Sequence, residues 1–115
     1  MKEAQQQVEQ FLHAHHLALS PQGCFTDLVS EIGEAGKELL LATQYETQPF
    51  ARRAELEEEL GDCLFSILRL CSSLQIDAQG ALALALKKYE ARFMQKHHIG
   101  SEEGKKERES EAAEK

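Results

Sequence analysis

The segment from Leu56 to Leu74 reads LEEELGDCLFSILRLCSSL and carries an apolar residue at every third or fourth position. These positions are Leu56, Leu60, Leu64, Ile67, Cys71 and Leu74. Such spacing places them along one face of an α-helix. Phe65, Leu68 and Leu70 add apolar surface on other faces, and a helix that is apolar on several sides is covered on several sides. The segment predicts a helix over about residues 52–75 in an all-α fold and indicates that copies of the chain associate.

Three further helices are expected around this one. The first covers residues 2–18. Ser20-Pro21 is typical of an N-cap followed by proline in the first turn, so the second helix is expected from there to about residue 43. Residues 44–51 form a connection, and the last helix covers residues 77–97. We therefore expect a four-helix bundle whose centre is an antiparallel hairpin of the second and third helices.

Length and composition limit the partners. Residues 1–99 are expected to form one helical domain, and residues 100–115, which are charged and lack apolar periodicity, a disordered tail. The net charge of −7 argues against a nucleic-acid polymer, which requires a basic surface. The longest apolar run, Ala81 to Leu86, is far shorter than the roughly 20 residues of a membrane span. With no apolar signal region at the N-terminus, a cytoplasmic protein without membrane contact is expected.

Two acidic couplets are the strongest chemical signal. Glu31-Ile32-Gly33-Glu34 and Glu59-Leu60-Gly61-Asp62 each place two carboxylates three residues apart, on one helix face. Glu34 to residue 46 is twelve positions, and residue 47 to Glu59 is again twelve, so an antiparallel hairpin that turns between them brings the couplets together. Four adjacent carboxylates repel one another, and hard cations such as Mg²⁺ prefer oxygen ligands. The sequence therefore predicts a metal site.

Several details around the couplets stay open. Glu58 lies four residues before Asp62 and can replace Glu59 as a ligand. Glu38, one turn beyond Glu34, can be an extra ligand, a base that orients water, or plain surface charge. Mid-helix glycines such as Gly33 and Gly61 each lower helix stability by about 0.5–1 kcal/mol relative to alanine. Their presence suggests a close approach of another backbone, room for a ligand, or simple helix packing.

The two couplets, with their spacing and context, resemble a known enzyme family. The pattern is E-x-x-E, 24 intervening residues and E-x-x-D, within Glu58-Glu59-Leu60-Gly61-Asp62-Cys63-Leu64-Phe65. Over about residues 24–93 it is similar to the MazG-like nucleotide pyrophosphohydrolases of the all-α NTP pyrophosphatase superfamily. Lys88-Tyr89-Glu90-Ala91-Arg92 also fits the K-x-x-x-R pattern that follows in many members.

The resemblance implies an activity and roles for residues. Mg²⁺, with Mn²⁺ as a substitute, would be bound by Glu31, Glu34, Glu59 and Asp62, with Glu38 as a further catalytic candidate. The metal would hold a nucleoside triphosphate and activate a water that attacks the α-phosphorus, giving a nucleoside monophosphate and pyrophosphate in nucleotide-pool house-cleaning. Lys88 and Arg92 would neutralise phosphate oxygens. Many members stack the base on tryptophan, which this chain lacks, so the stacking candidates are Phe25, Tyr45 and Phe50.

Two other functions compete with this one. The first is phosphoribosyl-ATP pyrophosphohydrolase, although that group usually has Ala-Asp where this chain has Gly61-Asp62. The second is a non-catalytic helical protein that binds metal or nucleotide without turnover. In each case a homodimer or homotetramer is expected.

Overall fold

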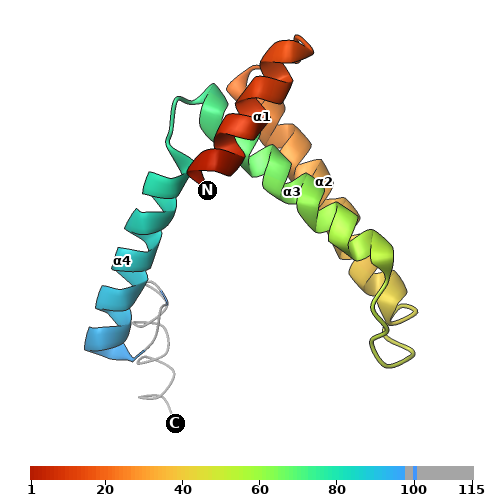
Figure 1. The fold of residues 1–115 in the computed structure, drawn as a ribbon. Coiled ribbons are helices and arrows are strands. Elements are labelled where there is room, and N and C mark those ends of the chain that lie inside the picture. Colours follow the sequence, from red (N-terminus) through yellow and green to blue (C-terminus); the bar gives the residue numbers. More distant parts are fainter. Residues whose placement is uncertain (98–99, 101–115) are drawn as a thin grey trace. The chain divides into compact units, whose positions relative to one another are not determined.

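A computed structural model describes residues 1–97 and Gly100. They form the helices α1 (Lys2–Ala14), α2 (Pro21–Ala42), α3 (Ala54–Ser73) and α4 (Ala78–Lys96), as Figure 1 shows. These residues include no β-strand, which confirms the all-α prediction. Apart from Gly100, the segment expected to be a disordered tail lies outside the described residues.

The helix boundaries follow local signals in the sequence. The Ser20 hydroxyl accepts a hydrogen bond from the Gly23 amide at 3.1 Å, and Pro21 occupies the first helical position, as expected for a capped N-terminus. The first helix is shorter than predicted, because it ends at Ala14 rather than near residue 18. His16 adopts a left-handed backbone with φ of 53°, and the Leu17 amide bonds back to the Leu12 carbonyl. The chain thus leaves the helix four residues before the predicted end at residue 18.

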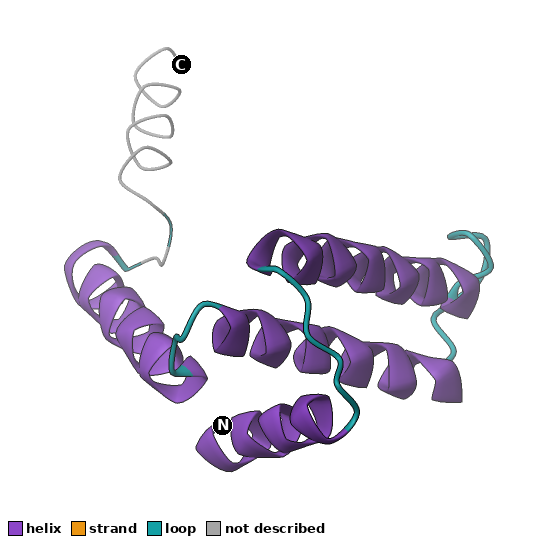
Figure 2. Cartoon of the chain, turned by 90° about the horizontal axis from the view of Figure 1, so that it is seen from above, coloured by secondary structure: helices purple, strands orange, loops and turns teal. Residues whose placement is uncertain are grey.

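The described residues fall into two compact units. The first, Met1–Gln79, contains α1, α2 and α3, and the second begins at Gly80 and holds most of α4. Within the first unit, α2 and α3 run antiparallel side by side, and α1 packs against α3 (Figures 1 and 2). The predicted hairpin of the second and third helices is confirmed. The assignment of residues 1–99 to a single domain stays a prediction.

A small core joins α1 to the end of α3. Val8, Leu68 and Ala78 are buried together, with Phe65 and other half-buried side chains packed around them. The buried Gln5 side chain donates to the Ser72 hydroxyl at 3.2 Å and to the Ile76 carbonyl at 2.8 Å, and accepts from the Ala78 amide at 2.8 Å. The side chain of Gln5 therefore gives hydrogen-bond partners to the backbone groups of Ile76 and Ala78 between α3 and α4. A buried backbone group without such a partner would destabilise the fold.

Much of the apolar surface of α3 stays exposed in the single chain. Leu60, Leu64 and Ile67 are 56%, 42% and 43% exposed, whereas Leu68, on another face, is 2% exposed. The face with the most regular apolar spacing is therefore not the face that packs within the chain. No helix in the part of the chain that the structure describes is long and apolar enough to cross a membrane.

The mid-helix glycines do not serve close packing within the chain. A Cβ built at Gly33, Gly36 or Gly61 meets no neighbouring described atom within 4 Å. The suggestion that their backbones approach another helix closely is therefore wrong for the single chain, because the surface beside each is open. Room for a ligand or for a second copy stays a prediction.

Candidate metal centre

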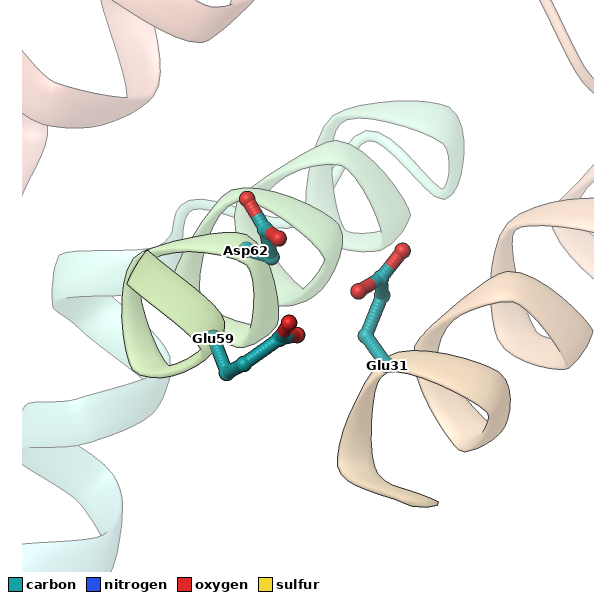
Figure 3. A group of neighbouring side chains, drawn as sticks. All are labelled: Glu31, Glu59 and Asp62. Carbon is teal, nitrogen blue, oxygen red and sulfur yellow. The ribbon is translucent and has the colours of Figure 1, made fainter. Parts of the chain in front are cut away.

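Three carboxylates converge across the α2–α3 hairpin. Glu31 comes from α2, and Glu59 and Asp62 come from α3. One carboxylate oxygen from each lies within 4.8 Å of the others. Figure 3 shows the Glu31 side chain extending from its helix toward those of Glu59 and Asp62. The hairpin therefore brings one carboxylate of the first couplet, Glu31, to both carboxylates of the second.

The placement of these residues follows from helix geometry. Glu59 and Asp62 are three residues apart and so share a face of α3. The neighbouring Glu58 is exposed and is not part of the group, so the geometry brings Glu59 rather than Glu58 to Glu31. Packing against α2 fixes the rotation of α3 about its axis. This rotation places Glu59, and not the adjacent Glu58, beside Glu31.

The negative charges in the group repel one another. Partial burial, followed by the charges of Asp62, Asp27 and Glu34, raises the pKa of Glu31 above its ordinary value. Partial burial and the charges of Asp62, Glu34, Glu31 and Glu38 raise the pKa of Glu59 in the same way. Both effects disfavour the ionised carboxylate. A cation among these oxygens would relieve the repulsion.

The donor set fits a hard divalent cation. All three side chains offer carboxylate oxygens, the ligands that Mg²⁺ and Mn²⁺ prefer. Mg²⁺ with ligands at about 2.0–2.1 Å holds opposite oxygens about 4.2 Å apart. The spread of 4.8 Å needs only a small side-chain adjustment to close to that size. The residues present therefore fit such an ion.

The other two predicted glutamates of α2 lie differently. Glu34 is exposed and outside the group of three, but its charge reaches both Glu31 and Glu59. Glu38 is paired with an arginine: its Oε2 accepts a hydrogen bond from Arg53 Nε at 2.9 Å, and its side chain is 15% exposed. Its charge also reaches Glu59. That bond, with the charge of Glu38, raises the pKa of Arg53. The geometry makes Glu38 an ion-pair partner at the start of α3.

The remaining predicted residues are not part of this group. Lys88 and Arg92 lie on α4, on either side of Tyr89, with Lys88 Nζ 4.9 Å and Arg92 Cζ 5.9 Å from the ring centroid. Tyr45 and Phe50 lie in the loop after α2, and Glu31 is eleven residues from the end of α2, about 16 Å along the helix. Phe25 is six residues before Glu31 and is 56% exposed. Base stacking by these aromatic residues stays a prediction.

Two residues beside the group were not predicted. The Ser66 hydroxyl, which is 2% exposed, donates to Asp27 Oδ2 at 3.1 Å and ties α3 to α2. Asp27 lies four residues before Glu31, and Ser66 four residues after Asp62, so each lies one turn from a carboxylate of the group. The signal that could have found them is a buried polar residue within an otherwise apolar helix, because such a residue needs a partner.

Cys63 is a further neighbour of the group. The thiol is half-buried and forms no disulfide. Burial, and then the charges of Glu31, Glu59 and Asp62, raise its pKa. A thiol held in its protonated form is a poor nucleophile, which argues against a nucleophilic role for Cys63.

Comparisons with known proteins identify the family of this chain. The sequence profile of the MazG nucleotide pyrophosphohydrolase domain matches residues 20–97. A nucleoside triphosphate pyrophosphohydrolase/pyrophosphatase MazG from Thermotoga maritima is 42% identical over 50 residues, which are 44% of this chain and only 20% of that protein. The crystal structure of YPJD, a pyrophosphatase candidate from Bacillus subtilis, superposes with a TM-score of 0.66 at 29% identity, covering 80% of this chain and 94% of that one. The chain belongs to the MazG nucleotide pyrophosphohydrolase family.

Proposed function

We propose that this chain is a Mg²⁺-dependent nucleoside triphosphate pyrophosphohydrolase. It adds water at the α-phosphorus of a (d)NTP and breaks the bond to the bridging oxygen, so that a (d)NMP and pyrophosphate are formed. The observation that carries the proposal is the convergence of Glu31, Glu59 and Asp62 in a chain of the MazG family. House-cleaning of the nucleotide pool in the cytoplasm is the role that this chemistry serves best.

The residues of the chain have separate roles in this proposal. Glu31, Glu59 and Asp62 hold the metal, and Glu34 adds negative charge beside them. When bound, Mg²⁺ supplies Lewis-acid chemistry and offsets the charge of the triphosphate. Lys88 and Arg92 supply positive charge to phosphate oxygens, because phosphoryl transfer depends chiefly on positioning and charge stabilisation.

The decisive experiment measures pyrophosphate release from a panel of nucleotides with Mg²⁺ and with EDTA. The panel contains the common dNTPs, dUTP and phosphoribosyl-ATP, so that the competing pyrophosphohydrolase activity is tested at the same time. Removal of one carboxylate in Glu59→Gln or Glu34→Gln is expected to lower kcat about 10²-fold, the scale on which single electrostatic contacts act in catalysis.

Glu57→Gln is the matched control. Glu57 lies on the same helix but its side chain is 80% exposed and paired with Arg52 at 3.6 Å. This variant is expected to keep full activity. If the wild type releases no more pyrophosphate than Glu59→Gln, the chain is not an enzyme of this kind. Nucleotide binding without turnover would then favour a non-catalytic binding protein.

A further inference from the structure

One guanidinium group of the first compact unit is linked to the metal group. Arg53, the residue before α3, donates from its Nε to Glu38 Oε2 at 2.9 Å. The charge of Glu38 in turn reaches Glu59. A single carboxylate therefore connects this arginine to the three carboxylates that converge across the hairpin.

The position of Arg53 follows from the two arms of the hairpin. Arg53 lies six residues before Glu59 on one arm, and Glu38 lies seven residues after Glu31 on the other. Six or seven residues correspond to about 9–10 Å along a helix. The arginine and its partner therefore lie about two turns from the carboxylates, on the side of the hairpin turn.

The outer edge of this guanidinium is open to a ligand. The Arg53 side chain is 40% exposed. Its Nη2 lies 4.0 Å from Glu55 Oε2, which is beyond hydrogen-bond distance, and neither Nη1 nor Nη2 donates a hydrogen bond within the described part of the chain. Glu38 takes only the Nε donor, so the paired donors at Nη1 and Nη2 stay available to an oxyanion.

The other two arginines of the first compact unit are placed differently. Arg52 is 72% exposed and pairs with Glu57 at 3.6 Å. Arg69 donates from Nη2 to the Leu17 carbonyl oxygen at 2.9 Å, and its Nε is buried. Arg53 is thus the arginine of this unit that combines a link to the metal group with an accessible outer edge.

We propose that Arg53 binds the phosphate chain of the substrate through Nη1 and Nη2. The substrate class rests on the function proposed above. A bound divalent cation offsets part of the charge of a triphosphate, and the carboxylates around it leave the rest to another cation. The planar fork of a guanidinium matches two oxygens of one phosphate. Glu38 holds the fork in place, and the phosphate chain then extends from the carboxylates toward the hairpin turn.

Calorimetric titration of the intact chain with inorganic triphosphate and Mg²⁺ tests this contact without a base or a sugar. Arg53→Gln is expected to weaken binding at least about tenfold, the scale of one charge-assisted hydrogen bond. Arg52→Gln is the matched control, because it removes an exposed arginine next in the chain, and should leave binding unchanged. The proposal is wrong if the wild type does not bind triphosphate, if Arg53→Gln binds it equally well, or if both variants lose the same affinity.

A second variant separates contact with the ligand from a structural role of the ion pair. Glu38→Gln removes the same ion pair but keeps Arg53. It is expected to bind triphosphate at least as tightly as the wild type, because the guanidinium remains and one negative charge is lost. A loss of affinity as large as that of Arg53→Gln would assign the effect to the ion pair and overturn the proposal.

Steady-state kinetics distinguish this inference from the proposed function. With the nucleotide that the wild type hydrolyses fastest, Arg53→Gln should raise KM about tenfold and keep kcat within a few-fold, since a contact made equally in the ground state and the transition state acts on KM. If no nucleotide is hydrolysed but triphosphate binding depends on Arg53, the proposed function fails and the contact stands. If nucleotides are hydrolysed and KM is the same in Arg53→Gln and wild type, the contact is wrong and the proposed function stands.

Discussion

At the scale of single residues, the carboxylates of Glu31 and Glu59 are expected to destabilise the metal-free protein. The pKa values of Glu31 and Glu59 are raised because the folded chain places each beside other negative charges in a partly desolvated position. Between the ordinary value of 4.5 and the raised value, the folded state binds more protons than the unfolded state. The metal-free protein therefore loses stability as the pH rises through this window.

Neutralising one of these groups is expected to reverse the effect. Glu59→Gln should melt at a higher temperature than the wild type at neutral pH in EDTA, and the difference should vanish below pH 4.5, where the carboxyl is protonated in both states. Mg²⁺ should raise the melting temperature of the wild type more than that of the variant, since a ligand stabilises the state that binds it. Thermal melts followed by circular dichroism measure all three. A variant that melts below the wild type in EDTA at neutral pH would contradict the repulsion.

Glu38 is expected to act on stability rather than on catalysis. Its carboxylate is held by Arg53 at 2.9 Å and is not one of the three converging carboxylates. Glu38→Gln and Arg53→Gln should therefore both lower the melting temperature, Arg53→Gln slightly more because it also removes the 4.0 Å pair with Glu55. The double variant should add little to Arg53→Gln, because both substitutions remove the Glu38–Arg53 pair. Pyrophosphate release by Glu38→Gln should stay within a few-fold of wild type. A loss of activity as large as that of Glu59→Gln would instead make Glu38 a ligand or a base.

At the scale of elements, the Ser66–Asp27 hydrogen bond joins α3 to α2 beside the metal group. Asp27 lies one turn from Glu31 on α2, and Ser66 lies one turn from Asp62 on α3. Ser66→Ala leaves Asp27 without this donor and is expected to lower the free energy of unfolding by about 1 kcal/mol. Ser73→Ala is the matched control, because among the described residues the Ser73 hydroxyl bonds only to the Leu70 carbonyl of its own helix. Chemical denaturation distinguishes the two variants.

The same bond is expected to affect metal binding. If Ser66 and Asp27 hold the helices at the height where the carboxylates meet, Ser66→Ala should weaken Mg²⁺ binding about 10-fold, the lower end of what supporting contacts contribute. Calorimetric titration of Mg²⁺ measures this. An unchanged affinity in a destabilised variant would limit the bond to a structural role.

At the scale of the whole molecule, a single chain leaves much apolar surface uncovered. Large side chains on α3 and α4 remain exposed, including Leu64, Ile67 and Leu84, the last at 71%. Monomeric proteins rarely expose large contiguous apolar patches. We therefore expect a homodimer or homotetramer in solution, as the sequence pattern indicates.

Light scattering at micromolar concentration tests the assembly. The wild type is expected to have the mass of two or four chains. Ile67→Glu places a charge on the exposed face of α3 and should shift the mass toward one chain, whereas Glu57→Gln, on the same helix, should not. A wild-type mass of one chain would show that the exposed face has no partner of its own kind.

The sequence by itself determined the features that depend on neighbours along the chain. The 3.6-residue periodicity, the Ser20 cap and the prolines place four helices close to their observed bounds, since helix formation is governed by contacts up to four residues apart. The equal arms about residue 46 predict that the couplets meet, because two antiparallel helices rise at the same rate. The family follows from the same local patterns.

Only the tertiary structure decided which helix faces meet. It selects Glu59 over Glu58, pairs Glu38 with Arg53 and joins Ser66 to Asp27. It also buries Leu68 while the more regular stripe of α3 stays open, and it gives the mid-helix glycines open surroundings instead of a close neighbour. The physical reason is that periodicity defines the faces of a helix, whereas the rotation and height of one helix against another are set by contacts between residues distant in sequence.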